Sequence, residues 1–304
     1  MLRFLIQRGA LSILVCLMVM AVSFLLTRLS GDLAVSIAGP NATGEDIEMV
    51  RQAYGLDRPL ILQFLEWASS ALRGDFGDSY FYHAPVATLI FERLPVTITL
   101  GLVGLSIAII IGIPLGIVAA LYEGTVFDRA IAFFALIGQA LPNFWLGLLF
   151  VIWFGVYWQL LPISGVDTWQ GYIMPGIVLA SSSIPVLMRL TRSGMIDALS
   201  SDYVRTARAK GLRHSSVVLK HALRNAAMPV VSIAAVQLGF MLGGSIIIET
   251  VFALNGVGYL AWEAISKNDF PVVQAVVLFL AVIFILLTFL SDVVNAMLDP
   301  RLRI

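Results

Sequence analysis

The three histidines of this 304-residue sequence lie far apart in the chain, at His83, His214 and His221. Neither they nor the single cysteine form a cluster with the spacing of a zinc site. A hydrolase acting within a membrane would need a nucleophile beside a general base, and the apolar segments contain serines but no histidine. The residue types therefore predict no catalytic site and no cofactor or metal bound by this chain.

The lysines also exclude ATP hydrolysis by a P-loop. That loop requires Gly before the lysine and Ser or Thr after it, whereas Lys210, Lys220 and Lys267 follow Ala, Leu and Ser. Energy for an active process must then come from another chain or from an ion gradient. A proton-coupled carrier favours a carboxylate near the middle of a span. Glu249 and Asp292 sit at the ends of predicted spans, where neither needs to be buried.

The most informative segment, residues 189–224, carries eight basic and two acidic residues. From Ser201 it reads Ser-Asp-Tyr-Val-Arg-Thr-Ala-Arg-Ala-Lys-Gly-Leu. Ser201 suits the N-cap of a helix, and Gly211 suits the C′ position, where φ is commonly positive. Ser215 or Ser216 suits the N-cap of a second helix. The pattern predicts two short amphipathic helices joined at Gly211.

This basic segment has two interpretations. Its positive charge could anchor the chain to lipid headgroups. Alternatively, the small residues Ala207 and Ala209, followed by Gly211, could let another protein approach closely.

Polar side chains inside the apolar segments are candidates for lining a transport pathway, although each could instead make a structural hydrogen bond. The candidates are Gln139, Asn143, Ser182 within the run Ser181–Ser183, Gln237 and Gln274. The motifs Gly112-x-x-x-Gly116 and Gly239-x-x-x-Gly243 predict close helix contacts, within the chain or between subunits. Pro114 is expected to kink its helix.

The amino-acid composition indicates that long apolar helices position these polar and basic residues. Hydrophobic residues make up 59% of the chain and charged residues 12%, with a net charge of zero. A disordered chain would be poor in apolar residues, and a soluble nucleic-acid-binding protein would carry a basic excess. Stretches without Asp, Glu, Lys or Arg are long enough for helices that cross a membrane. Those of at least 19 residues are Gly9–Thr27, Leu94–Tyr122, Ala130–Val166, Thr168–Met188, Asn225–Ile248 and Phe270–Ser291.

The third stretch is ambiguous because it could contain one span or two short ones. We predict one span near 130–157 followed by a re-entrant or surface segment, since aromatic residues, Pro162 and Gly165 crowd its end. The first stretch could be a cleaved signal peptide, but its apolar run exceeds the usual length of a signal core and no small-residue cleavage site follows at once. Six uncleaved spans are predicted.

The distribution of Lys and Arg orients these spans. With the N-terminus inside, the inner segments hold 13 Lys and Arg and the outer segments hold 6. The acidic residues show the opposite distribution, so the inner side carries +7 and the outer side −7. Both termini are therefore predicted to be cytoplasmic.

The outer segment 28–93 is predicted to be helical. Thr43 and Asp46 resemble a capping box, and Gly55 would end that helix. A second helix would follow Asp57-Arg58-Pro59, and Gly74-Asp75-Phe76-Gly77 would form a turn. This segment could stabilise the spans, offer a docking surface for an outer partner, or do both.

The basic segment resembles the cytoplasmic signature loop of bacterial ABC-importer permeases, Glu-Ala-Ala-x-x-x-Gly. Against this general signature the chain reads Arg205-Thr206-Ala207-x-x-x-Gly211, so the Glu and the first Ala are absent. The stretch from Asp202 to Leu212, however, closely resembles the form found in the dipeptide/oligopeptide/nickel subfamily. Further similar motifs extend over essentially the whole chain: Gly55-Leu56-Asp57-Arg58-Pro59-Leu60, Gly74-Asp75-Phe76-Gly77, His221-Ala222-Leu223-Arg224-Asn225-Ala226, Glu249-Thr250-Val251-Phe252 and Asp299-Pro300-Arg301. One departure is Leu254-Asn255-Gly256-Val257-Gly258, where the family usually has Pro before the first Gly.

The resemblance implies an all-α integral membrane protein with six transmembrane helices, similar to type I ABC-importer permeases, with a helical extracytoplasmic segment between spans 1 and 2. It implies a permease subunit in a bacterial inner membrane that forms half of a pathway for di- or oligopeptides or a related small solute by alternating access. Nickel or glutathione import is the alternative within the family. An ion-coupled secondary transporter or a membrane scaffold is the alternative outside it.

The resemblance also implies partners: a second, related permease chain, two cytoplasmic ATPases that carry ATP and Mg²⁺, and an extracytoplasmic solute-binding protein, in addition to membrane lipid and without nucleic acid. By resemblance, the ATPases would contact a coupling loop at 192–224. The residues expected to carry this contact are Tyr203, Arg205, Thr206, Ala207, Arg208, Lys210 and Gly211. The expected divisions are an N-terminal span (1–29), an extracytoplasmic segment (30–93), a transmembrane core (94–298) and a cytoplasmic tail (299–304).

Overall fold

The computed structural model describes residues 2–29, 31–39 and 41–298, and within these ranges it contains helices and no strand. The motif Asp299-Pro300-Arg301 and the expected tail lie outside the described residues. The helices are α1 (Leu2–Leu29), α2 (Leu33–Ala38), α3 (Gly44–Ala53), α4 (Leu60–Ala71), α5 (Val86–Leu121), α6 (Val126–Ala140), α7 (Asn143–Phe150), α8 (Ile173–Ser181), α9 (Ile184–Ser200), α10 (Asp202–Ala209), α11 (His214–Ser216), α12 (Leu223–Val251), α13 (Val257–Ser266) and α14 (Phe270–Leu298). Short π or 3₁₀ segments cover Val151–Tyr157, Trp169–Tyr172 and Val217–Ala222.

Four helices of the described chain are long and apolar enough to cross a membrane, and two bent pairs bring the number to six if each pair crosses once. The four cover Ile6–Leu29, Val86–Leu121, His214–Val251 and Phe270–Val294. The bent pairs are Val126–Ala140 with Asn143–Tyr157, and Trp169–Ser181 with Ile184–Ser200. The predicted number of spans agrees with this arrangement.

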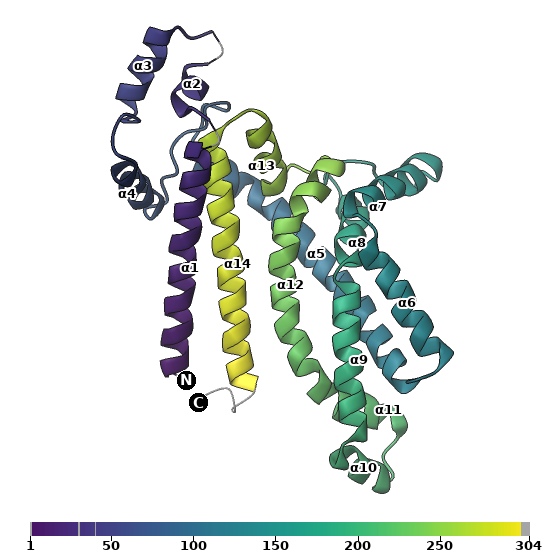
Figure 1. The fold of residues 1–304 in the computed structure, drawn as a ribbon. Helices are drawn as coiled ribbons and strands as arrows, with labels where there is room; N and C mark the ends of the chain where they lie inside the picture. Colours follow the sequence, from purple (N-terminus) through teal and green to yellow (C-terminus); the bar gives the residue numbers. More distant parts are fainter. Residues whose placement is uncertain (1, 30, 40, 299–304) are drawn as a thin grey trace.

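In the third apolar stretch, the region predicted as one span near 130–157 is divided between two helices. Its two helices meet at a bend of 95°, and Leu141 between them has an extended backbone with ψ of 133°. The reason is Pro142, because a proline disfavours the α conformation in the residue before it. Only α6 follows the direction of the bundle, whereas α7 extends sideways (Figure 1).

The basic segment 189–224 is also more helical than predicted. Helix α9 continues to Ser200, and the helix that includes α12 starts at His214. Charged residues end an apolar span, but they do not end a helix that still has favourable backbone hydrogen bonds and packing. The part that leaves the two long helices is therefore 201–213, which is much shorter than the expected loop at 192–224.

The helices give the molecule two distinct ends (Figure 1). The N-terminus, the turn between α5 and α6, and the segment α10–α11 lie at one end, here called the α10 end. Helices α2–α4 and α13 lie at the opposite end, here called the α13 end. In between, α1 packs against α14, and α5 crosses behind α12 and α9.

Small residues set the closest helix contacts. A Cβ added to Gly116 would lie 2.6 Å from the carbonyl oxygen of Met188, and one at Gly112 would lie 3.1 Å from that of Ile184. The first glycine motif therefore mediates packing of α5 on α9 within this chain. In the second motif, Gly239 lies against Phe284 of α14.

The outer segment contains the predicted helices and one more. The capping box of α3 is present, with the Asp46 backbone N–H donating to Thr43 Oγ1 (3.3 Å) and the Thr43 N–H donating to the Asp46 carboxylate (2.9 Å). Gly55 ends the helix with φ of 62°, and the N–H of Leu56 reaches back to the Arg51 carbonyl (2.8 Å). The additional helix is α2, capped by Asp32.

Candidate functional site

Helix α10 and the turn after it project from the bundle at the α10 end (Figure 1). The helix ends as predicted at Gly211, whose φ is 74°. The N–H of Gly211 donates to the carbonyl of Arg208 (3.0 Å), and that of Leu212 donates to the carbonyl of Ala207 (3.4 Å). This Schellman motif turns the chain sharply toward α11, and glycine permits the positive φ without steric cost.

The caps predicted for the two short helices are wrong in detail. Ser201 occupies the N-cap position of α10, but its hydroxyl donates to the carbonyl of Ala198 (2.5 Å) and caps nothing. The N-cap of α11 is Arg213, so Ser215 and Ser216 lie inside the helix. Hydroxyl groups can bond to the preceding turn instead of the following one, and here Ser201 does so.

Helix α10 has one buried face. Val204 and Ala207 pack against Met195 of α9 and against Val217 and Val218, which precede α12. Ala207 is therefore turned toward its own chain, and of the predicted small-residue face only Ala209 and Gly211 are exposed.

The opposite face of α10 is exposed and basic. It carries the other residues expected to form the coupling contact: Tyr203, Arg205, Thr206, Arg208 and Lys210. The ion pair of Arg205 with Asp202 (3.2 Å) is largely exposed, so it contributes little to stability and leaves the basic charge accessible.

An ion pair links α9, which leads directly into α10, to α6. The guanidinium of Arg192 donates from Nε to Asp128 Oδ1 and from Nη2 to Oδ2, both at 2.7 Å. The Asp128 side chain is 8% exposed, and its Oδ2 also accepts the N–H of Gly124 (3.0 Å). Two parallel bonds from one guanidinium fix orientation as well as distance. The base of the projecting segment is thus held to the neighbouring span.

The five pathway candidates do not gather at one site. Gln139 is exposed and accepts from Arg189 (3.3 Å), and Asn143 begins α7 just beyond the 95° bend. Ser182 lies at the bend between α8 and α9 and donates to the carbonyl of Leu179. Gln237 of α12 donates to Ser183 (2.8 Å) at the same bend. Gln274 is buried at the α13 end, away from the other four.

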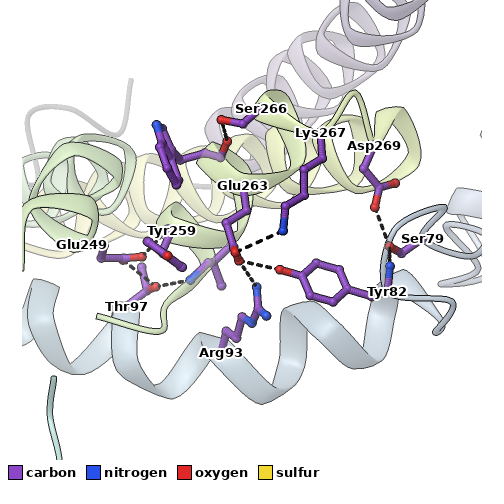
Figure 2. Close-up of polar contacts among 12 residues, drawn as sticks. Ser79, Tyr82, Arg93, Thr97, Glu249, Tyr259, Glu263, Ser266, Lys267 and Asp269 are labelled. Atoms are coloured by element: carbon purple, nitrogen blue, oxygen red, sulfur yellow. Dashed lines mark hydrogen bonds and ion pairs between the residues drawn. The ribbon is translucent and has the colours of Figure 1, made fainter. Parts of the chain in front are cut away.

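A buried carboxylate, that of Glu249, lies near the α13 end. Its place at the end of a predicted span did not require burial, yet Glu249 is 0% exposed. It accepts the hydroxyl of Thr97 (2.8 Å) and the N–H of Tyr259 (2.8 Å), and Thr97 in turn accepts the N–H of Val257 (2.8 Å) (Figure 2). The carboxylate therefore joins α12, α5 and the start of α13.

Two glycines make room for this carboxylate. A Cβ at Gly256 or at Gly258 would lie 2.4 Å or 2.9 Å from Glu249 Oε2. The turn that departs from the family pattern contains both of them, with Gly256 at the N-cap of α13. In the sequence, the pair Gly256-x-Gly258 downstream of Glu249 is the signal that could have predicted this contact. Glycines allow the backbone to lie close to another group.

A second polar cluster attaches the loop before α5 to α13. Glu263 accepts the hydroxyl of Tyr82 (2.5 Å) and pairs with Arg93 (3.7 Å) and Lys267 (3.5 Å) (Figure 2). Burial, and after it the bond to Glu263, raise the pKa of Tyr82. Asp292, at the other end of the molecule, is 19% exposed and pairs with Arg8 (3.0 Å).

Asp269 extends this attachment to the first residues of the loop. Its carboxylate accepts the Ser79 hydroxyl (2.5 Å) and the backbone N–H of Tyr80 and Phe81 (3.2 and 3.3 Å). Among the residues that the structure describes, no three His, Cys, Asp or Glu side chains form a group suited to a metal ion.

Comparison with known proteins identifies the family. Residues 112–304 match the family described as binding-protein-dependent transport system inner membrane component, and residues 1–101 match the N-terminal region of such membrane components. The chain belongs to this family. It is a permease component of an ABC importer, as the resemblance implied, which decides against an ion-coupled carrier and against a scaffold.

Individual relatives agree with the family assignment. The glutathione transport system permease protein GsiC of Escherichia coli K12 is 43% identical over 275 residues, which cover 90% of each chain. GsiC of Shigella flexneri serotype 5b gives the same values. An inward-facing structure of the MetNI methionine ABC transporter has a TM-score of 0.59 and 18% identity, and the match covers 69% of this chain and 96% of that one. This structure supports the predicted type I importer fold.

Proposed function

We propose that this permease forms half of a membrane pathway that imports short peptides, with glutathione, itself a tripeptide, as the first substrate to test. The observation that carries the proposal is the 43% identity to the glutathione permease GsiC over 90% of both chains. A nickel complex is the alternative within the family, and the absence of a metal-binding group among the described residues gives no support for it.

Energy is proposed to enter through the exposed face of α10. The chain has no P-loop lysine, so two partner ATPases would bind ATP and Mg²⁺ and press on Tyr203, Arg205, Thr206, Arg208, Lys210 and Gly211. Helix α10 packs on α9 and on the residues that lead into α12. A displacement of α10 would therefore be transmitted to two spans at once, which is the linkage that alternating access requires.

The α10 end is proposed to be cytoplasmic, in the inner membrane of a bacterium. The segments that lie at this end hold 13 of the 19 basic residues, counting the terminal residues by sequence. The segment 30–93 and helix α13 would then be extracytoplasmic and would face the solute-binding protein, while a second, related permease chain would complete the pathway. The division into 1–29, 30–93, 94–298 and 299–304 belongs to the same proposal.

The substrate is tested with the assembled transporter in proteoliposomes, with ATP supplied to the ATPases and the cognate binding protein on the other side. Uptake of labelled glutathione, a dipeptide, a longer oligopeptide and Ni²⁺ is compared. Saturable, ATP-dependent uptake of glutathione or another short peptide supports the proposal. Uptake of Ni²⁺ alone, or uptake that depends on an ion gradient without ATP, contradicts it.

A further inference from the structure

Helix α4 carries an exposed stripe of aliphatic side chains. Ile61, Leu65 and Leu72 lie on one face, and they are 74%, 56% and 78% exposed. Leu60 and Leu62 flank the stripe and are also exposed. In water, a helix buries its aliphatic face against the rest of the protein. Here no part of the described chain buries this face.

The adjacent part of the same helix packs against a membrane span. The rings of Phe64 and Trp67 lie 5.5 and 5.9 Å from the ring of Phe24 in α1. Phe24 precedes the end of the apolar span at Leu29 by five residues, or roughly 7 Å at the helical rise of 1.5 Å per residue. Helix α4 therefore lies level with the last turns of α1 and not beyond them, as Figure 1 shows.

Polar side chains of α4 border a pocket at the α13 end. Gln63, Glu66 and Ser70 line this pocket of about 780 Å³ together with Arg28 and Tyr80. Gln63 is buried, whereas the Glu66 side chain is 60% exposed and pairs with Arg58. The aliphatic stripe lies on a face of the helix separate from Gln63 and from the aromatic contact with α1. Such a stripe is stable where the surroundings are hydrocarbon.

The surroundings of the stripe favour lipid over a protein partner. In the last turns of α1, Leu25, Leu26 and Leu29 are exposed at the same level. The stripe is aliphatic and lacks the aromatic and arginine anchors that are common at the centre of protein interfaces.

Arg58 and Arg73 flank α4, and their guanidinium groups bond to side chains of the helix, Arg58 to Glu66 (2.8 Å) and Arg73 to Ser69 (3.5 Å). Trp67 occupies a level where tryptophan is enriched in membrane proteins.

We propose that α4 lies in the membrane interface at the α13 end, with Ile61, Leu65 and Leu72 in contact with the acyl chains of the leaflet. The helix would then act as a lateral anchor that fixes the depth and tilt of α1 and of the outer segment. This contact with lipid is independent of the identity of the substrate.

The test uses nitroxide labels on the complete transporter in proteoliposomes. The only cysteine, Cys16, is replaced (Cys16→Ser), and single cysteines are introduced as Ile61→Cys, Leu65→Cys and Leu72→Cys. Glu48→Cys on α3, whose native side chain is 56% exposed, is the matched control. Collision rates with oxygen, which concentrates in acyl chains, and with a water-soluble nickel chelate are measured for each label.

The proposal requires an oxygen-to-nickel collision ratio at the α4 labels that is several-fold above the ratio at Glu48→Cys. Ratios equal to the control would place the stripe in water and overturn the proposal. Immobilised labels that collide with neither reagent would show that another protein chain covers the stripe, which would also overturn it. Three labelled positions keep the result interpretable if one variant fails to assemble.

Discussion

At the scale of single residues, Glu249 is closely constrained by its neighbours near the α13 end. It is fully buried, and its carboxylate accepts hydrogen bonds from α5 and from the first turn of α13. If the carboxylate is removed, the buried donors that it accepted from remain away from water without a hydrogen-bond partner. Each such donor then costs its full free energy of desolvation, so the site is sensitive to substitution. The nearby Gly256 and Gly258 leave no space for a side chain.

Replacing Glu249 by Ala is expected to destabilise the permease by about 1–3 kcal/mol for each donor left unpaired. The measurement is the free energy of unfolding, or the thermal midpoint, of the purified complex in detergent. Glu45→Ala on the exposed surface of α3 is the control. Equal stability of the two variants would contradict the structural role given to Glu249.

At the scale of the element, α10 combines a buried apolar face with an exposed basic face, and the positive φ of Gly211 sets its exit. The orientation of α10 depends on α9, and α9 is tied to α6 through Arg192 and Asp128. If α10 carries the proposed contact with the ATPases, substitutions at Gly211 and at the Arg192–Asp128 pair are expected to disturb it independently.

Gly211→Val is expected to abolish the ATPase activity stimulated by loaded binding protein while leaving membrane insertion intact. A β-branched residue at positive φ costs about 1–2 kcal/mol and displaces the turn. Gly74→Val is a matched control, because Gly74 also has positive φ (82°) and open space around a Cβ, but it lies after α4, at the other end of the molecule. Normal stimulation in Gly211→Val, or equal loss in both variants, would refute the special role of α10.

Arg192→Ala is expected to lower stability by about 1.5–3 kcal/mol, because the buried Asp128 carboxylate loses its charged partner. Replacing both residues by Leu removes the unpaired charge and is expected to recover part of the loss. Unfolding in detergent and stimulated ATPase activity are measured for the single and double variants. A double variant less stable than Arg192→Ala would argue against an unpaired charge as the cause.

At the scale of the whole molecule, the zero net charge conceals two oppositely charged sides. The segments assigned to the inner side carry +7 and those assigned to the outer side −7. The α10 end is therefore expected to face the cytoplasm, where Lys and Arg flanking the spans are retained. The two ends of the fold provide exposed positions that test this orientation.

Glu45→Cys and Glu123→Cys, both at exposed positions in a Cys16→Ser background, are expected to react on opposite sides of the membrane. In intact spheroplasts, a membrane-impermeant maleimide should label Glu45→Cys, and Glu123→Cys should react only after permeabilisation. The reverse pattern would invert the orientation, and labelling of both in intact cells would contradict the placement of the two residues at opposite ends.

The sequence by itself determined the apolar spans, the capping box of α3, the positive φ of Gly211 and the family, because each depends on composition or on residues close together in the chain. Tertiary structure alone decided the burial of Glu249, the inward face of Ala207, the separation of the five pathway candidates and the exposure of the aliphatic stripe on α4. These features depend on partners that are distant in sequence, such as Thr97 and Glu249, which are 152 residues apart. Local patterns contain no information on which distant side chains the packed helices bring together.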